Sequence, residues 1–300
     1  MRCSTAAIQA LAMHPRYAQR EEIIEEAMAM TEVLFKKQLD CTFIINMLVE
    51  KAYTILEPKI PRLIKTQRPS GMWKIKDCRR ISYGVLKALK HSGHLTSLLR
   101  ENRFRRDPFL SFRDDNDYYG FVIRRNIMEE PLSIDARLQE QLVSDIFVNQ
   151  DESGSWNNTV ISTSNHLESL VELGLGLDDR RILNSSNWLL SMCVKDVYRE
   201  SKKVGGVVVA HNMFSSRDRA DEFKSALAEK PEWNPVGLCY LHLPIIQTGT
   251  ALKTLVRLGL EDDERVIAAC DNLLALKQTY GGWCESNIRN GLLAKQKIVR

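Results

Sequence analysis

The 300-residue chain lacks the sequence signatures of several common protein classes. It has no run of about 18 uncharged apolar residues, so the sequence predicts no membrane span. Its first residues lack the long apolar core of a secretory signal peptide. It also has no glycine-rich phosphate loop, no nucleophile elbow with a Ser–His–Asp set, and no His-Glu-x-x-His motif. These absences exclude a P-loop nucleotidase, an α/β-hydrolase and a zincin-type metalloprotease.

The number of cysteines and the net charge further limit the class of protein to which the chain can belong. The seven cysteines are odd in number and widely scattered, which argues against a disulfide framework and for a reducing compartment. We therefore expect a cytoplasmic protein, for which peripheral contact with a membrane stays open. The net charge is only +4, and short basic clusters such as Arg103, Arg105 and Arg106 show no sustained pattern of a nucleic-acid reader. Solvated faces explain these clusters, so we expect no nucleic-acid partner.

What the chain does contain is a helix–turn–helix unit, most complete from Gln247 to Trp283. Apolar residues recur with helical spacing after Thr250, Gly259 ends the first predicted helix, and Asp262 opens the second. A unit with one apolar face cannot bury that face alone, so it predicts neighbours of the same kind. Hydrophobic residues make up 44% of the chain, which is ample for a sizeable core.

Copies of this unit recur along the sequence. The clearest runs from Ile161 to Cys193, where LESLVELGLGLDDRR matches LKTLVRLGLEDDER after a one-residue insertion. A turn from glutamine to tryptophan appears three times, as QRPSGMW at Gln67, QDESGSW at Gln150 and QTYGGW at Gln278. The alignment predicts first helices that open near Ser4, Ile81, Ser162 and Gln247, and second helices that open near Glu21, Asp135, Asp178 and Asp262.

Two segments interrupt the repeat, residues 101–130 and residues 195–235. Non-repeat insertions in repeat proteins usually gather on one face and often carry the binding surface. Around them we expect a single domain over residues 1–300. Because the chain opens directly on the first helix of a repeat, we expect that an earlier N-terminal element is missing.

The Gln–Trp turns give the chain a family resemblance. A glutamine followed by a Gly-x-Trp turn, between helix pairs whose first helix opens on a small hydroxyl residue, resembles the terpenoid cyclase and protein prenyltransferase superfamily. The turns at Gln67, Gln150 and Gln278 carry the resemblance, which covers most of the chain outside the two insertions. It implies an all-α fold, an α/α toroid in which inner and outer helices form a barrel. It also implies structural turns, since the amide satisfies helix-end groups and the indole buries a large area.

The resemblance implies two chemistries, and the chain departs from the motif of each. Class II cyclases protonate an alkene with an Asp-x-Asp-Asp acid, which is absent here. The nearest stretch is DDND at residues 114–117, where neighbouring carboxylates would raise the pKa of Asp115. In the order Asp-Asp-x-Asp, the same stretch resembles carboxylates that hold magnesium and diphosphate. A polar surface loop is the alternative explanation.

Protein prenyltransferases bind zinc through an Asp-x-Cys pair and a histidine. Here Asp77 and Cys78 follow a Gly-x-Trp turn but are adjacent, without the intervening residue, and His166 lies on the next predicted inner helix. Carboxylate, thiolate and imidazole together suit zinc. The alternative is a hydrogen-bonded His166 that faces the cavity, within reach of Tyr83 and Asp77. A second zinc set consists of Cys239, His242 and Cys284.

These motifs predict a toroid protein that binds or transforms an isoprenoid or similar apolar molecule in its central cavity. As an enzyme it would be a prenyltransferase-like transferase or a cyclase-like isomerase. The predicted catalytic residues are His166, Asp77, Tyr83 and Asp115, and zinc held by Asp77, Cys78 and His166 is the candidate metal, although no cofactor is predicted firmly. The alternative is a non-catalytic toroid that binds a lipid, peptide or protein partner.

Overall fold

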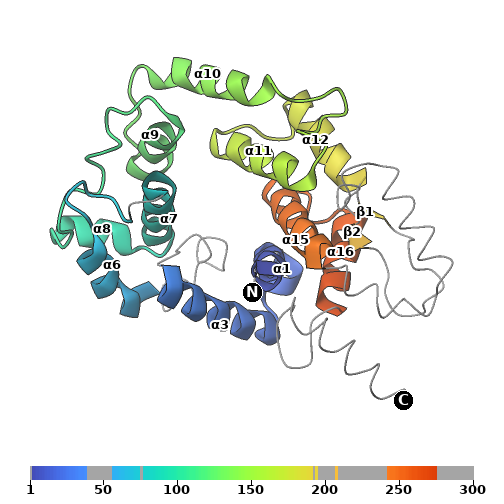
Figure 1. The fold of residues 1–300 in the computed structure, drawn as a ribbon, viewed down its shortest axis with the longest axis horizontal. Helices are drawn as coiled ribbons and strands as arrows, with labels where there is room; N and C mark the ends of the chain where they lie inside the picture. Colours follow the sequence, from blue (N-terminus) through green and yellow to red (C-terminus); the bar gives the residue numbers. More distant parts are fainter. Residues whose placement is uncertain are drawn as a thin grey trace. The chain divides into compact units, whose positions relative to one another are not determined.

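The computed structural model describes residues 2–38, 56–74, 77–191, 193–194, 207–208 and 242–275. In these ranges the protein is all-α apart from one pair of two-residue strands (Figure 1). The predicted turn at Gln278 and the zinc candidates Cys239 and Cys284 lie outside the described residues, as does the side chain of His242. Within the same ranges, none of the helices combines the length and apolar character needed to cross a bilayer.

The chain forms two compact units, each described here by itself. Unit 1 comprises Met1–Gln19 and Asn149–Arg300, and unit 2 comprises Arg20–Val148. The elements of unit 1 are α1 (Arg2–Met13), α2 (Pro15–Ala18), α11 (Val160–Glu172), α12 (Arg180–Ser191), β1 (Cys193–Val194), β2 (Val207–Val208), α15 (His242–Arg257) and α16 (Glu264–Ala275). Those of unit 2 are α3 (Glu21–Gln38), the 3-10 turn η1 (Glu57–Lys59), α6 (Ile60–Thr66), α7 (Cys78–His91), α8 (His94–Arg100), α9 (Tyr118–Ile123), the π-helical turn η2 (Arg124–Met128) and α10 (Asp135–Phe147).

The predicted helices are confirmed. The first helices of the repeat are α1, α7, α11 and α15, and the second helices are α3, α10, α12 and α16. Leu170 and Leu255, which the repeat places on core faces, are fully buried. In unit 1, α15 packs against both α1 and α11, so the N-terminal helix lies against a helix from the late part of the chain (Figure 1). Segment 101–130, predicted to interrupt the repeat, contains α9 and η2, and α9 packs against α7 and α10.

The two LGL stretches end their helices in the same way. Gly174 and Gly259 have left-handed backbones with φ of 92° and 82°. The next residues, Leu175 and Leu260, donate their N–H groups to the carbonyl five residues earlier, at 3.0 Å in both cases. Glycine adopts this conformation without steric strain, which is why the repeat uses it to stop both helices.

Two side chains attach the N-terminal helices of unit 1 to α16 and the loop before it. His14 donates from Nε2 to the Glu261 carbonyl at 3.0 Å, while its Nδ1 accepts the N–H of Arg16 at 3.2 Å. The Tyr17 hydroxyl donates to Asp271 Oδ1 at 2.7 Å. Burial lowers the pKa of His14, which favours the neutral ring that these two hydrogen bonds require.

Gly249 on α15 allows close contact with α1, and its replacement gives a test of that packing. A Cβ atom at this position would lie 2.4 Å from the carbonyl carbon of Ala6 and 2.8 Å from the nitrogen of Ala7, and neither backbone atom can rotate away. We expect Gly249→Ala to lower the free energy of unfolding by about 1–3 kcal/mol in urea denaturation. Glycine-to-alanine changes inside helices otherwise stabilise by roughly 0.5–1 kcal/mol, so a gain in stability would refute the close contact.

Candidate functional site

The two described Gln–Trp turns share one geometry. Gln67 faces Trp73, and Gln150 faces Trp156, across an isolated antiparallel bridge. Both indoles are fully buried. In each turn the glutamine amide donates to the carbonyl of the turn's glycine, at 2.9 Å in the first and 3.3 Å in the second. These contacts indicate a structural role for both turns, as the sequence predicts.

Each turn is also bonded to the next helix and to a later segment of the chain. The backbone N–H of the tryptophan donates to a hydroxyl near the start of the following helix, to Ser82 at 2.9 Å in the first copy and to Thr163 at 3.0 Å in the second. The small hydroxyl residue of the repeat therefore satisfies a buried backbone donor. The Gln67 amide donates to the carbonyl of Arg106 in segment 101–130 at 2.9 Å, and the Gln150 amide donates to the hydroxyl of Ser185 on α12 at 2.7 Å, so each turn is bonded to a later segment.

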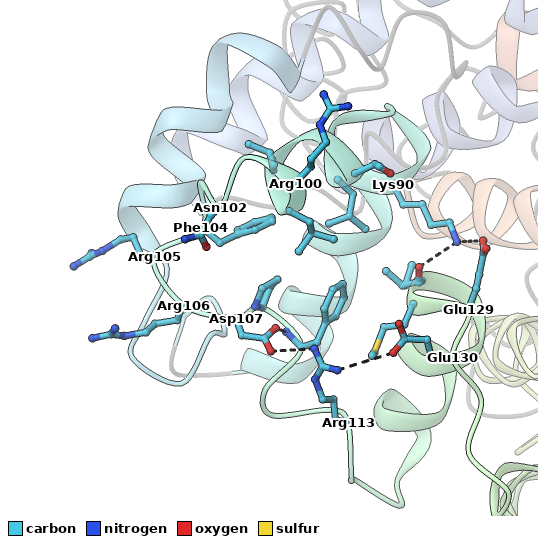
Figure 2. Close-up of a pocket in the computed structure, with 18 residues that line it drawn as sticks. Lys90, Arg100, Asn102, Phe104, Arg105, Arg106, Asp107, Arg113, Glu129 and Glu130 are labelled. Atoms are coloured by element: carbon cyan, nitrogen blue, oxygen red, sulfur yellow. Dashed lines mark hydrogen bonds and ion pairs between the residues drawn. The ribbon is translucent and has the colours of Figure 1, made fainter.

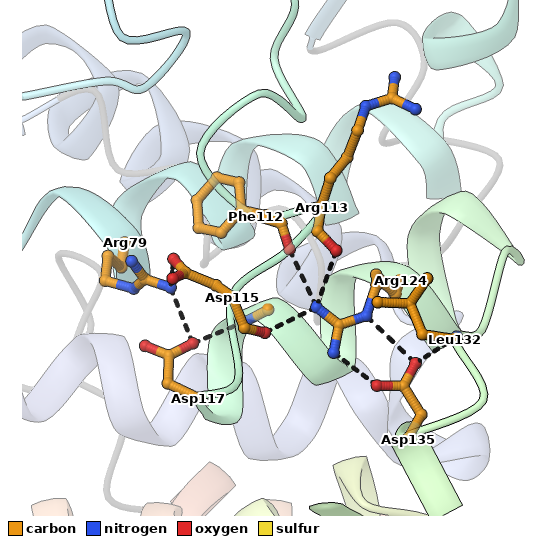
Figure 3. Close-up of polar contacts among 9 residues, drawn as sticks. Arg79, Phe112, Arg113, Asp115, Asp117, Arg124, Leu132 and Asp135 are labelled. Atoms are coloured by element: carbon orange, nitrogen blue, oxygen red, sulfur yellow. Dashed lines mark hydrogen bonds and ion pairs between the residues drawn. The ribbon is translucent and has the colours of Figure 1, made fainter.

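Three of the four predicted catalytic residues lie around the N-terminal ends of α7 and α9 in unit 2. Asp77 directly precedes α7, Tyr83 lies on α7, and Asp115 lies just before α9. Arg79, on the first turn of α7, forms ion pairs with Asp115 at 2.5 Å and with Asp117 at 2.8 Å (Figure 3). Burial opposes the charge on Arg79, but its hydrogen bonds to the two carboxylates outweigh burial and raise its pKa.

The ion pair with Arg79 bears on the role of Asp115. An aspartate that donates a proton needs surroundings that disfavour its charged form, whereas a guanidinium favours that form. Asp117 also caps α9, because its Oδ1 accepts the N–H of Gly120 at 2.8 Å. The arrangement therefore favours a structural role for the DDND stretch, and proton donation by Asp115 stays a prediction.

Three half-buried tyrosines lie beside these charges and form what we call the tyrosine cluster: Tyr83, Tyr118 and Tyr119. The ring centroids of Tyr83 and Tyr119 are 6.2 Å apart, and those of Tyr118 and Tyr119 are 5.2 Å apart. Lys87 Nζ lies 5.5 Å from the centroid of the Tyr83 ring. Burial raises the pKa of Tyr119, and the nearby charge of Arg80 opposes that shift. The cluster combines aromatic surface with flanking cations.

The predicted zinc ligands belong to different units. Asp77 has a left-handed backbone, with φ of 53°, and Cys78 is a half-buried free thiol in unit 2. His166 belongs to unit 1, where its ring stacks on Trp156 at 5.0 Å and its Nδ1 donates to the Ser162 carbonyl at 2.8 Å. The sequence predicted a hydrogen-bonded His166 within reach of Tyr83 and Asp77, whereas this hydrogen bond is to its own helix. In the described part of the chain, no three His, Cys, Asp or Glu side chains gather as metal ligands, and zinc stays a prediction.

Arg124 holds the segment before α9 in place through contacts with Asp135 and with three backbone carbonyls. The starts of α12 and α16 carry local ion pairs, Asp179 with Arg181 at 2.6 Å and Asp263 with Arg265 at 2.7 Å. Asp135, at the start of α10, instead accepts two hydrogen bonds from Arg124, at 3.1 Å and 2.5 Å. Arg124 also donates to the carbonyls of Phe112, Arg113 and Asp115 (Figure 3). It therefore fixes the segment that carries the DDND stretch.

Comparisons with known proteins assign no function to these residues. Comparison of the chain with protein-family models, with curated proteins and with solved structures finds no match. The resemblance to the terpenoid cyclase and protein prenyltransferase superfamily therefore rests on the sequence motifs and stays a prediction.

Proposed function

We propose that the protein is a toroid of the terpenoid cyclase and prenyltransferase type that binds an isoprenoid or similarly apolar molecule. A toroid requires its first and last inner helices to meet, and the packing of α1 against α15 supports this arrangement. The shared geometry of the turns at Gln67 and Gln150 supports the repeated helix pairs.

The observation that carries the proposed ligand class is the tyrosine cluster. Tyr83 lies on α7 and Tyr118 and Tyr119 lie on α9, and all three residues are only half-buried, so each keeps surface that a ligand can contact. Aromatic rings contribute large apolar contact areas and pack well against unsaturated chains. Lys87 and Arg80 place positive charge beside these rings, which suits a ligand whose apolar chain ends in a polar group.

The second candidate is a non-catalytic toroid that binds a lipid, peptide or protein partner. The ion pair between Arg79 and Asp115 favours it, because this pair opposes proton donation at the carboxylate best placed for acid chemistry. Under both candidates the tyrosine cluster is a binding surface, and they differ in whether bound molecules are converted.

Binding of farnesol to the intact chain, measured by isothermal titration calorimetry, tests the proposed function. We expect saturable binding, and we expect Tyr83→Leu to weaken it about ten-fold because the aromatic face is lost while the apolar volume is kept. Tyr83→Phe is the matched control and should bind as the parent does. If a folded Tyr83→Leu variant bound farnesol as tightly as the parent does, the tyrosine cluster would not be the binding site. Mass spectrometry after incubation with farnesyl diphosphate distinguishes an enzyme from a binding protein.

A further inference from the structure

A pocket of about 910 Å³ lies in unit 2, away from the tyrosine cluster. It opens beside Lys90, at the C-terminal end of α7, and is walled by α8, by the segment 102–113 and by η2 (Figure 2). Most of its lining comes from segment 101–130, the insertion predicted to carry a binding surface. Pockets that bind small molecules span roughly 300–1,000 Å³, so this one is large enough for a complete ligand.

The floor of the pocket is apolar. Leu95, Leu98, Phe109 and Ile127 line it and are at most 6% exposed, so they belong to the core of unit 2. Leu99 also lines it but remains 40% exposed. Covering such a side chain with an apolar group is favourable, by about 25 cal/mol for each Å² removed from water. The floor therefore suits an apolar chain.

Ion pairs on the rim engage every acidic side chain of the lining (Figure 2). Arg113 pairs with Asp107 at 3.1 Å and with Glu130 at 4.0 Å. Lys90 pairs with Glu129 at 2.5 Å. Since each of these carboxylates already has a cationic partner, the rim offers little unbalanced negative charge to a ligand.

Positive charge on the rim is in excess. Arg100, Arg105 and Arg106 also line the pocket, so its five cationic side chains outnumber the three acidic ones. Within the described residues, the ion pair formed by one of these three arginines is that of Arg100 with Glu101, at 4.0 Å. Arg105 donates to the neutral carbonyl of Lys65 at 2.9 Å. Figure 2 shows Arg105 and Arg106 extending outward on the same side of the pocket. This excess favours a negatively charged ligand group at that edge.

The wall formed by η2 is an irregular helix that Lys90 holds in place. Lys90 Nζ donates to the carbonyls of Asn126 at 3.0 Å and Ile127 at 3.2 Å. Glu129 ends the turn with a left-handed backbone, at φ 60°. Short π-helical turns are uncommon in proteins and frequently occur at functional sites, which agrees with a ligand-binding role for this wall.

We infer that the pocket binds a small amphiphilic anion. Its apolar chain lies on the floor beside Leu99, and its carboxylate or phosphate head lies at the edge formed by Arg105 and Arg106. Arginine side chains form charge-assisted hydrogen bonds with either head group. The site is separate from the tyrosine cluster, so the two proposals stand or fall independently.

Calorimetric titration of the intact chain with four ligands of equal chain length tests this site. The ligands are dodecanoate, dodecyl phosphate, dodecanol and dodecyltrimethylammonium, each kept below its micelle concentration. We expect the anions to bind at least about ten-fold more tightly than the cation, and we expect this preference to fall as salt is added. Whichever anion binds more tightly identifies the head group. The titrations are repeated with Tyr83→Leu, which removes binding at the tyrosine cluster, and the preference for anions should persist in that variant.

Variants of the floor and of the rim, each with a control variant, test the contributions of these two parts of the pocket to binding. Leu99→Ser should weaken the binding of all four ligands. Arg105→Gln combined with Arg106→Gln should weaken the binding of the two anions only. The matched controls are Leu183→Ser, 41% exposed in unit 1, and Arg137→Gln, exposed on α10; both should bind as the parent does. Thermal melting by circular dichroism establishes that each variant is folded. Equal affinity for the anionic and cationic chains, or unchanged binding by folded Leu99→Ser, overturns the inference.

Discussion

Replacement of Trp156 by alanine is expected to lower the free energy of unfolding by about 3–5 kcal/mol. The indole is fully buried, and the ring of His166 stacks on it at 5.0 Å. Truncation removes this packing and leaves a cavity that the surrounding backbone, fixed by the hydrogen bond to Thr163, cannot readily close. Urea and thermal denaturation followed by circular dichroism measure the loss.

Two further substitutions define how this result is interpreted. Ile161→Ala, at a 39% exposed position on the adjoining helix, should change stability by no more than about 0.5 kcal/mol. Trp73→Ala should lose as much as Trp156→Ala, because Trp73 is equally buried and its Nε1 donates to the Leu63 carbonyl at 2.9 Å. A Trp156→Ala protein that melts with the parent would show that the turn has no structural role.

Loss of Arg124 is the second large effect that we expect. Its side chain is 1% exposed and that of its partner Asp135 is 5% exposed, so Arg124→Met leaves a buried carboxylate without its cation. Such a change should destabilise the protein by about 3–5 kcal/mol. Combining Arg124→Met with Asp135→Leu should recover part of this loss, since no buried charge then remains. A double variant less stable than Arg124→Met alone would contradict this account.

The same ion pair makes stability depend on pH. Burial opposes the charge on Asp135, but hydrogen bonds from Arg124 and from the N–H of Leu132 outweigh burial and hold its pKa below the ordinary 3.8. Its stabilising contribution is therefore fully present above that ordinary pKa and is lost as pH falls through the lower pKa of the folded state. In acid titration of stability, Asp135→Asn should show a smaller change over this range than the parent.

Local sequence signals were sufficient to predict the helices. Apolar spacing gave the buried positions of Leu170 and Leu255, and the glycines at 174 and 259 gave the helix ends, because each depends on residues within one or two turns. The recurrence of the Gln–Trp turn likewise predicted the burial of Trp73 and Trp156. These features required no knowledge of which helix packs against which.

Partners distant in sequence could not be predicted in this way. The DDND stretch gave no sign that Asp117 would pair with Arg79, 38 residues away. Nor did the sequence around Asp135, predicted only as the start of a helix, indicate that Arg124 of η2 would be its partner. The sequence singled out His166 as a candidate zinc ligand or cavity residue, but its stacking on Trp156 depends on how the preceding turn folds back.

Because α1 packs against α15, the ribosome makes α1 long before the helix that covers it. His14 and its acceptor Glu261 are 247 residues apart, and Tyr17 and Asp271 are 254 apart. The apolar side chains of α1, including Ile8 and Leu11, are buried in the native protein, yet their partner α15 is translated near the end of the described chain. All residues of unit 2 are consecutive and emerge in between. The apolar side chains of newly made α1 therefore lack this partner until α15 is translated, and exposed apolar surface of this kind makes folding chains prone to aggregate.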